Sequence, residues 1–279
     1  MSRGEAGPLH GQRVVVTGGS GILGRVMALA LAEDGATVHV GGRSAESSER
    51  AIAEVLEGHP NRADLQGRLK PLVFDVLDPA SMHSAAAEVD AAGGTDILIN
   101  AAGGNVPSAS TTPETTFFDV DLKAVERVID LNLVGTVAAT QAFARGMCER
   151  GQGVIVNVSS MSAVRPLTRV LGYSASKAAV DNFTQWLAVN LAQQYGRGLR
   201  VNAVAPGFFL TEQNRYLMLN EDGSPTPRAQ SVLAHTPQGR FGEPGDLVST
   251  LRWLVSPHSA FVTGIVVPVD GGFSAFAGV

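Results

Sequence analysis

Short runs of β-branched and other apolar residues recur along the chain, separated by longer stretches with the spacing of amphipathic helices. Most runs are apolar at every position, which is typical of strands in a parallel sheet that helices cover on both faces. The helical stretches include long ones expected over residues 121–149 and 172–195. This alternation predicts one α/β domain built on a doubly wound parallel sheet. The predicted strands cover residues 13–17, 37–40, 72–76, 96–100, 153–160, 200–206 and 265–270.

Two long segments interrupt this alternation, residues 103–120 after the fourth strand and residues 207–245 after the sixth. Ligands of doubly wound sheets bind beyond the carboxyl ends of the strands. Insertions at that edge are therefore expected to cover a substrate, and segment 207–245 is predicted to be a lid. Because no linker or internal repeat divides the chain, we expect a flexible tail over residues 1–10 and a single domain over 11–279.

The composition of the chain argues against several classes of binding partner. Hydrophobic residues make up 44% and charged residues 17% of the 279 positions, which is enough for a large core. A net charge of −5 argues against a nucleic-acid partner or an anionic membrane surface. The single cysteine gives no disulfide framework, and the six histidines show no metal-ligand spacing, so no metal is predicted. No signal peptide or membrane-spanning apolar run is visible, and the expected location is the cytoplasm.

A glycine-rich stretch, TGGSGILG at residues 17–24, follows the first predicted strand. Read from Gly19 it is G-x-G-x-x-G, a pattern typical of a dinucleotide-binding turn. Read from Thr17 it is nearly T-G-x-x-x-G-x-G, except that Ile22 stands where the second glycine would be. Glycines here let the backbone approach phosphate groups at the N-terminus of the next helix. We predict a variant phosphate loop, rerouted by Gly19 and Gly21, that still binds a cofactor.

Three residues suggest acid–base chemistry. Tyr173 and Lys177 are one turn apart in a predicted helix, so their side chains share a face. An ammonium group beside a phenol favours the phenolate and is expected to lower the tyrosine pKa toward neutrality. Ser160, at the end of the fifth predicted strand, supplies a hydroxyl suited to hold a substrate oxygen.

The order of these motifs resembles that of the short-chain dehydrogenase/reductases, from about Gln12 to Gly272. The resemblance implies a single Rossmann-type sheet of about seven parallel strands in the order 3-2-1-4-5-6-7. It also implies hydride transfer between a nicotinamide cofactor and an alcohol or carbonyl group. The motifs that carry it are TGGSGILG, Asp75-Val76, NAAG at 100–103, Asn132 in LNLVGT, Ser160, YSASK at 173–177, PGFFLT at 206–211 and VDGG at 269–272.

The same resemblance implies roles for four catalytic residues. Tyr173 would be the general acid in reduction and the general base in oxidation, and Ser160 would hold and polarise the substrate oxygen. Lys177 would bind the nicotinamide ribose and lower the pKa of Tyr173. Asn132 would hold a water molecule that links Lys177 to solvent.

A set of cofactor contacts follows from the resemblance as well. At the end of the second strand, where an acidic residue would bind the adenosine ribose hydroxyls, the sequence has Gly42, followed by Arg43. Since an arginine can pair with a 2′-phosphate and no carboxylate repels it, NADP(H) is favoured, with NAD(H) as the alternative. The implied contacts are Gly18, Ser20, Gly21, Ile22, Leu23, Gly24, Arg43, Asp75, Val76, Asn100, Ala101, Ala102, Lys177, Pro206, Gly207, Phe209 and Thr211.

Within the family, the C-terminal third resembles one group of members, the D-mannonate oxidoreductases (fructuronate reductases), through stretches such as NFTQWLAVNLA, PGFFLTEQNR and AHTPQGRFGEP. This implies a small sugar-acid substrate, which needs a cation for its carboxylate and polar side chains for its hydroxyls. Arg240, in a motif of the wider family, is assigned to structure. The candidate substrate contacts are Asn105, Ser160, Arg165, Thr168, Arg169, Tyr173, Gln213, Asn214 and Arg215.

Two alternatives stay open. One is a reductase of the same family that acts on a 3-oxoacyl thioester, a cyclic ketone or another polyol. A cleft lined by Phe208, Phe209, Leu217 and Met218 would favour an apolar substrate of this kind. The other is a non-catalytic NADP-binding redox sensor, although such proteins usually lose the tyrosine or the lysine. The resemblance further implies a homotetramer, or a homodimer, joined through the helices expected over 121–149 and 172–195.

Overall fold

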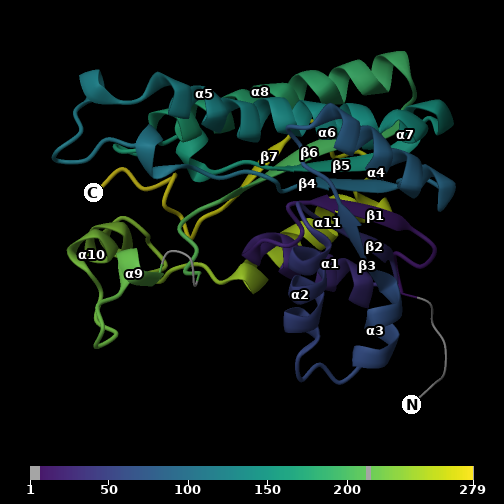
Figure 1. The fold of residues 1–279 in the computed structure, drawn as a ribbon, viewed down its shortest axis with the longest axis horizontal. Coiled ribbons are helices and arrows are strands. Elements are labelled where there is room, and N and C mark those ends of the chain that lie inside the picture. The colour runs from purple at the N-terminus through teal and green to yellow at the C-terminus, as the bar shows by residue number, and fades with distance from the viewer. Residues whose placement is uncertain (1–6, 212–214, 279) are drawn as a thin grey trace.

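The computed structural model describes residues 7–211 and 215–278. Its seven strands form one parallel sheet in the order β3-β2-β1-β4-β5-β6-β7, which confirms the predicted topology (Figure 1). At the centre of the sheet, Val16 of β1 pairs with Val40 of β2 and with Ile99 of β4. The strands are β1 Arg13–Thr17, β2 Thr37–Gly42, β3 Leu69–Val73, β4 Ile97–Asn100, β5 Gln152–Val158, β6 Gly198–Pro206 and β7 Val266–Val269.

Helices cover both faces of this sheet. In the view of Figure 1, one layer of helices lies below the strands and the other above, and α9 and α10 stand apart near the C-terminus. The lower layer contains α1 Ile22–Glu33, α2 Ala45–Leu56, α3 Arg62–Arg68 and α11 Val248–Val255. The upper layer contains α4 Pro79–Ala91, α5 Leu122–Ile129, α6 Gly135–Phe143, α7 Arg145–Arg150 and α8 Leu171–Gln194. The remaining two are α9 Arg215–Met218 and α10 Pro227–Ala234.

Two large cores follow from the alternation of side chains along each strand. In β1, Val14 and Val16 join the core that includes α1 and α11, whereas Val15 joins the core that includes α4, α6 and α8. All three valines are fully buried. Burial on both faces explains why the strands read as continuous apolar runs.

A smaller third core lies away from the sheet. It joins Ala109 and Val120 of the 103–120 insertion to Ala124, Val125 and Val128 of α5. The ring of Tyr173 packs against this cluster. The insertion is therefore anchored to α5 beside the start of α8.

The prediction of one continuous helix over residues 121–149 is wrong. After α5 the backbone makes one turn of π-helix, Asp130–Val134, before α6 and α7 follow. The Asn132 amide Nδ2 donates to the Val128 carbonyl oxygen at 2.8 Å, within this widened turn. A π-turn inserts one residue into a helix, which the averaged spacing of apolar residues does not reveal.

The third strand begins and ends earlier than expected. β3 covers Leu69–Val73 instead of 72–76, and α3, which was not predicted, precedes it. β3 is an edge strand, where Pro71 can stand because one side needs no ladder hydrogen bond. Pairing stops where β2 stops, at the Gly42–Val73 pair.

The described part of the expected N-terminal tail, residues 7–10, packs on the fold. Leu9 is 4% exposed and joins the core around α1. Its N–H donates to the Asp34 carbonyl oxygen at 2.9 Å. An apolar side chain thus fastens the segment just before β1, and the flexible tail over residues 1–10 stays a prediction.

Among the described residues, no helix has both the length and the apolar character needed to cross a bilayer. Within the same ranges, no group of three or more His, Cys, Asp or Glu side chains is placed to hold a metal ion.

Candidate active site

The glycine-rich loop connects β1 to the N-terminus of α1. Gly18 has a positive φ of 61°, and a Cβ there would lie 2.8 Å from the Ala102 Cα. A Cβ at Gly24 would lie 2.3 Å from the Gly18 carbonyl oxygen. Both positions therefore require glycine, because backbone atoms occupy the space of a side chain.

Gly21, the displaced middle glycine of the loop, has a backbone conformation that other residues can also adopt. Gly21 caps α1 with a φ of −75° and a ψ of 164°, which any residue adopts, and Ile22 is the first helical residue. A Cβ at Gly19 would lie 2.9 Å from the Val16 carbonyl oxygen. Of the two glycines expected to reroute the loop, Gly19 is the one that a side chain could not replace. The backbone does not require glycine at position 21.

This loop fits the pyrophosphate of a dinucleotide. The first N–H groups of α1, those of Ile22, Leu23 and Gly24, have no acceptor within the helix and favour an anion. Thr17 Oγ1 accepts from the N–H groups of Ala101 and Ala102 at 3.1 and 3.0 Å. The threonine thereby holds the segment after β4 against the loop.

Serine hydroxyls gather at the end of β2. A Cβ at Gly42 would lie 2.4 Å from Ser48 Oγ, 2.8 Å from Ser47 Oγ and 3.1 Å from Ser20 Oγ. Ser48 Oγ is buried without a hydrogen-bond partner, and the next residue after the strand, Arg43, is exposed. Position 42 has no room for a carboxylate side chain, and the surrounding groups are hydrogen-bond donors.

Three other residues expected to contact the cofactor have side-chain contacts within the protein. The Asp75 carboxylate accepts from the Leu77 N–H at 2.9 Å, and Val76 packs against the start of α6 at Gly135. Asn100 Nδ2 donates to Thr140 Oγ1 at 3.0 Å and to Asn157 Oδ1 at 2.9 Å. The cofactor contacts of Asp75, Val76 and Asn100 stay a prediction.

The segment after β6 is packed closely between two neighbours. The backbone leaves the sheet at Pro206, the last residue of β6, and a Cβ at Gly207 would lie 2.6 Å from the Asp270 Cα. Phe209 is 7% exposed and pairs with Gly242 in an isolated bridge. Thr211 is the last described residue before the gap.

The predicted catalytic residues meet where β5 and α8 adjoin. Ser160 follows β5, and Tyr173 lies in the first turn of α8. The Ser160 hydroxyl lies close enough to the Tyr173 phenol to lower its pKa. Lys177 Nζ lies 5.7 Å from the centre of the Tyr173 ring and donates to the Val158 carbonyl oxygen at 2.7 Å. Two hydroxyl groups and one ammonium group thus share one buried corner.

The pKa of Tyr173 is shifted in the direction opposite to the one expected from the sequence. Burial raises the pKa of Tyr173, and the Ser160 hydroxyl offsets only part of that rise. Burial also lowers the pKa of Lys177 to about 8, although the nearby Asp181 carboxylate raises it. The prediction that Lys177 brings the tyrosine pKa below its ordinary value is therefore wrong for the protein without a ligand. Desolvation of the phenol is the largest influence on its pKa.

Asn132 holds the start of the 103–120 insertion. Its Nδ2 donates to the Gly104 carbonyl oxygen at 2.7 Å, and its Oδ1 accepts from the Gly104 N–H at 3.1 Å. A Cβ at Gly103 would lie 2.6 Å from Asn132 Oδ1 and 3.3 Å from Lys177 Nζ. The loop therefore passes directly over the lysine. The amide of Asn132 positions this loop, and the water relay through Asn132 stays a prediction.

Asp181 is a member of the site that the sequence argument missed. It lies one turn after Lys177 on α8, and its Oδ1 is buried without a hydrogen-bond partner. Burial raises the pKa of Asp181, while a hydrogen bond from Ser159 and the charge of Lys177 lower it. The spacing K-A-A-V-D was the available signal, because residues four apart on a helix are neighbours.

The predicted substrate contacts are only partly brought together. Asn105 Nδ2 donates to Ser110 Oγ at 2.8 Å and so closes its own loop. Arg165 Nε donates to the Ser274 carbonyl oxygen at 3.1 Å and fastens the C-terminal segment. Thr168 and Arg169 are exposed, and their carbonyl oxygens accept from Thr111. Arg215 is exposed at the start of α9, and Gln213 and Asn214 lie outside the described residues.

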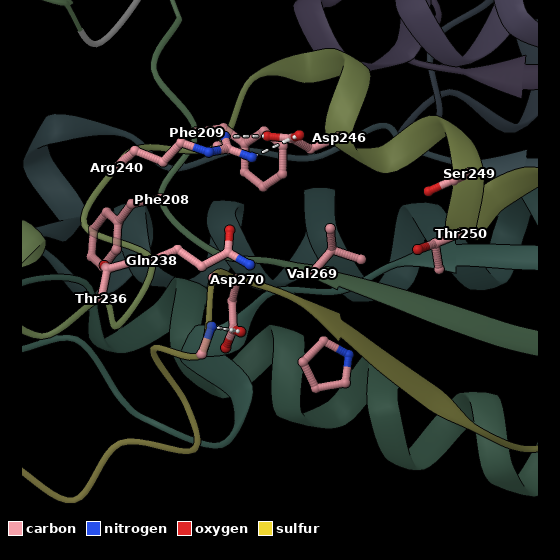
Figure 2. A pocket seen from close by; sticks show the side chains of 14 residues that line it. Phe208, Phe209, Thr236, Gln238, Arg240, Asp246, Ser249, Thr250, Val269 and Asp270 are labelled. Carbon is pink, nitrogen blue, oxygen red and sulfur yellow. Dashed lines mark hydrogen bonds and ion pairs between the residues drawn. The ribbon is translucent and has the colours of Figure 1, made fainter.

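A separate hollow of about 420 Å³ opens beside the segment after β6 (Figure 2). Arg240 crosses it to the Asp246 carboxylate, with contacts of 2.6 and 3.0 Å. This confirms the structural assignment of Arg240. The hollow is lined by Phe208, Phe209, Gln238 and Asp270 but by none of the four predicted catalytic residues.

Comparisons with known proteins all point to the same protein family. The family model for short chain dehydrogenases matches residues 12–222. An uncharacterized oxidoreductase of Bacillus subtilis, UxuB, is 43% identical, and the alignment covers 98% of this chain and 99% of that protein. A galactitol 2-dehydrogenase (L-tagatose-forming) of Cereibacter sphaeroides is 36% identical, with 96% and 97% covered.

A crystal structure supports the same grouping. The crystallised protein comes from Haemophilus influenzae, D-mannonate oxidoreductase activity has been attributed to it, and its structure contains bound NAD. It superposes with a TM-score of 0.87 at 38% identity, covering 97% of this chain and 98% of that one.

Proposed function

The chain belongs to the short-chain dehydrogenase/reductase family, and we propose that it transfers hydride between a nicotinamide cofactor and a sugar acid of the D-fructuronate/D-mannonate type. As a family member it is an oxidoreductase of alcohols and ketones that uses NAD(P). The observation that carries the chemistry is the placement of the Tyr173 phenol beside the Ser160 hydroxyl and the Lys177 ammonium group. The similarity to the Haemophilus influenzae protein supports the sugar-acid class.

The side chains of this corner suit the reduction of a ketone. The nicotinamide cofactor, when bound, supplies the hydride for the carbonyl carbon. Tyr173, whose pKa is raised, keeps its proton at neutral pH and can deliver it to the carbonyl oxygen as the hydride arrives. Ser160 donates a second hydrogen bond and fixes that oxygen. Lys177, beside the Tyr173 ring, adds positive charge where negative charge develops, and it would hold the nicotinamide ribose.

The direct test follows the oxidation of NADPH and NADH with D-fructuronate, D-tagaturonate and 5-keto-gluconate. We expect turnover of one of these keto acids, well above that of uncharged ketoses. Cofactor binding without turnover of any keto acid would contradict the sugar-acid assignment. Turnover of L-tagatose alone would instead favour the polyol alternative, which the similarity to a galactitol 2-dehydrogenase supports.

We also propose that NADP(H) is preferred. Arg43 and the serines around Gly42 offer donors to a 2′-phosphate, and position 42 has no room for a repelling carboxylate. Changing Arg43 to glutamine should raise the KM for NADPH about tenfold and leave the KM for NADH nearly unchanged. Steady-state kinetics with both cofactors measures this, with Arg62→Gln, an exposed arginine at the start of α3, as the control. An equal effect on both cofactors would contradict the preference.

An oligomer joined through α8 is the third part of the proposal. Trp186 and Val189 of α8 are 59% and 57% exposed, and Tyr195 just after the helix is 55% exposed. Trp186 and Tyr195 line a groove of about 770 Å³ between α6, α7 and α8. We expect Trp186→Asp to weaken self-association by about 2 kcal/mol or more, as measured by analytical ultracentrifugation. Exposed Trp253, on α11, gives the matched control Trp253→Asp. Unchanged association of the Trp186 variant would contradict this interface.

A further inference from the structure

Two arginines from distant parts of the chain lie within electrostatic reach of each other. Arg169 precedes α8, in the segment after Ser160, and Arg228 is the second residue of α10 in the 207–245 insertion. Burial, and then the charge of Arg169, lower the pKa of Arg228. Arg228 Nε is buried without a hydrogen-bond partner, and no carboxylate of the described residues pairs with either guanidinium.

The C-terminal segment and the 103–120 insertion hold this arrangement in place. Arg165, from the same segment as Arg169, donates to the Ser274 carbonyl oxygen. The neighbouring Phe273 and Phe276 rings lie 6.4 and 6.5 Å from the ring of His235, which ends α10. On the other side, the Thr111 N–H donates to the Arg169 carbonyl oxygen at 3.0 Å. The two arginines are thus carried by segments that are tied to one another.

Three features make this pair unfavourable without a ligand. A buried N–H without an acceptor loses the hydrogen bond that water would supply. Two like charges close together repel each other. A cation in the first turn of a helix such as α10 also opposes the positive end of the helix dipole. A single anion between the two guanidinium groups would relieve all three.

We propose that Arg169 and Arg228 together bind the carboxylate of the substrate. This rests on the proposed function and deepens it, because it makes α10 the element that recognises the charged end of the sugar acid. Guanidinium groups match carboxylates with paired hydrogen bonds, and the free Nε–H of Arg228 is one of the donors. Arg228 was absent from the candidates drawn from the sequence.

The test compares two probes that differ in one group. D-mannonate carries a carboxylate where D-mannitol carries a hydroxymethyl group. Binding of each is measured by calorimetry on the whole protein loaded with the reduced cofactor, which prevents oxidation of the probe. Arg228→Gln and Arg169→Gln should each weaken D-mannonate binding about tenfold to a hundredfold and leave D-mannitol binding unchanged. Arg228→Lys should restore part of the loss, and Arg62→Gln should change nothing.

Three outcomes separate the assignment from the proposed function. Unchanged D-mannonate binding in Arg228→Gln would overturn the assignment, even if keto acids are turned over. Loss of binding in a protein that reduces no keto acid would uphold the arginine pair and contradict the proposed function. Inorganic phosphate, the second probe, should compete with D-mannonate. Phosphate that binds through Arg228 without competing would overturn the assignment and show a separate anion site.

Discussion

Replacing Tyr173 with phenylalanine is expected to lower kcat by about a hundredfold to ten-thousandfold, the usual contribution of a positioned general acid. The ring would stay in place, since it packs against the small core of α5 and the 103–120 insertion. Only the hydroxyl that holds the proton would be lost, together with its interaction with Ser160. The cofactor dissociation constant should therefore change little, while turnover collapses.

Single-turnover kinetics and cofactor titration of the same preparation measure these two quantities separately. Tyr195→Phe is the matched control, because Tyr195 lies just after the other end of α8 and is 55% exposed. A Tyr173→Phe enzyme that keeps more than about a tenth of its kcat would show that another group delivers the proton.

Replacing Gly24 with alanine should weaken cofactor binding about a hundredfold or more and lower the free energy of unfolding by about 1–3 kcal/mol. The added methyl group would lie 2.3 Å from the Gly18 carbonyl oxygen and 2.9 Å from the Gly19 Cα. Both are backbone atoms of the phosphate loop, so the clash can be relieved only by moving the loop or the start of α1. Either movement displaces the N–H groups that face the phosphates.

Gly21→Ala is the matched control in the same loop. Its new methyl group would meet one atom, the Gly18 carbonyl oxygen at 3.2 Å, and its backbone is already extended. Cofactor titration and urea unfolding of both variants should therefore separate them clearly. Equal damage from the two substitutions would mean that the cofactor itself approaches Gly21 closely, and the displaced glycine would then have a direct role.

The sheet could be predicted from the sequence because its signal is local. Runs such as Val14 to Val16 are apolar and β-branched, and the central strands, such as β1 and β4, are buried on both faces. The π-turn around Asn132 could not be predicted in this way. One extra residue in a helix changes no composition and only shifts the phase of the apolar pattern.

In the candidate site, too, features set by local sequence spacing could be predicted, and features set by tertiary packing could not. Tyr173 and Lys177 were found because four residues along a helix fix their relation, and Ser160 because it comes just after an apolar strand. The raised pKa of Tyr173 depends on how deeply the fold buries it, which no spacing encodes. The charge of Arg169 acts on Arg228 across about sixty residues of sequence, so the sequence neighbours of Arg228 gave no signal.

The third core has a consequence for how this enzyme can change. Its apolar contacts join the 103–120 insertion to α5, and the π-turn separates α5 from the part of the helix that packs on the sheet. Substitutions there can reshape the loop whose start passes over Lys177, while the two large cores keep their own contacts. Selectivity for substrates is thereby open to variation at small risk to folding, and laboratory evolution of new specificity would best begin in this insertion.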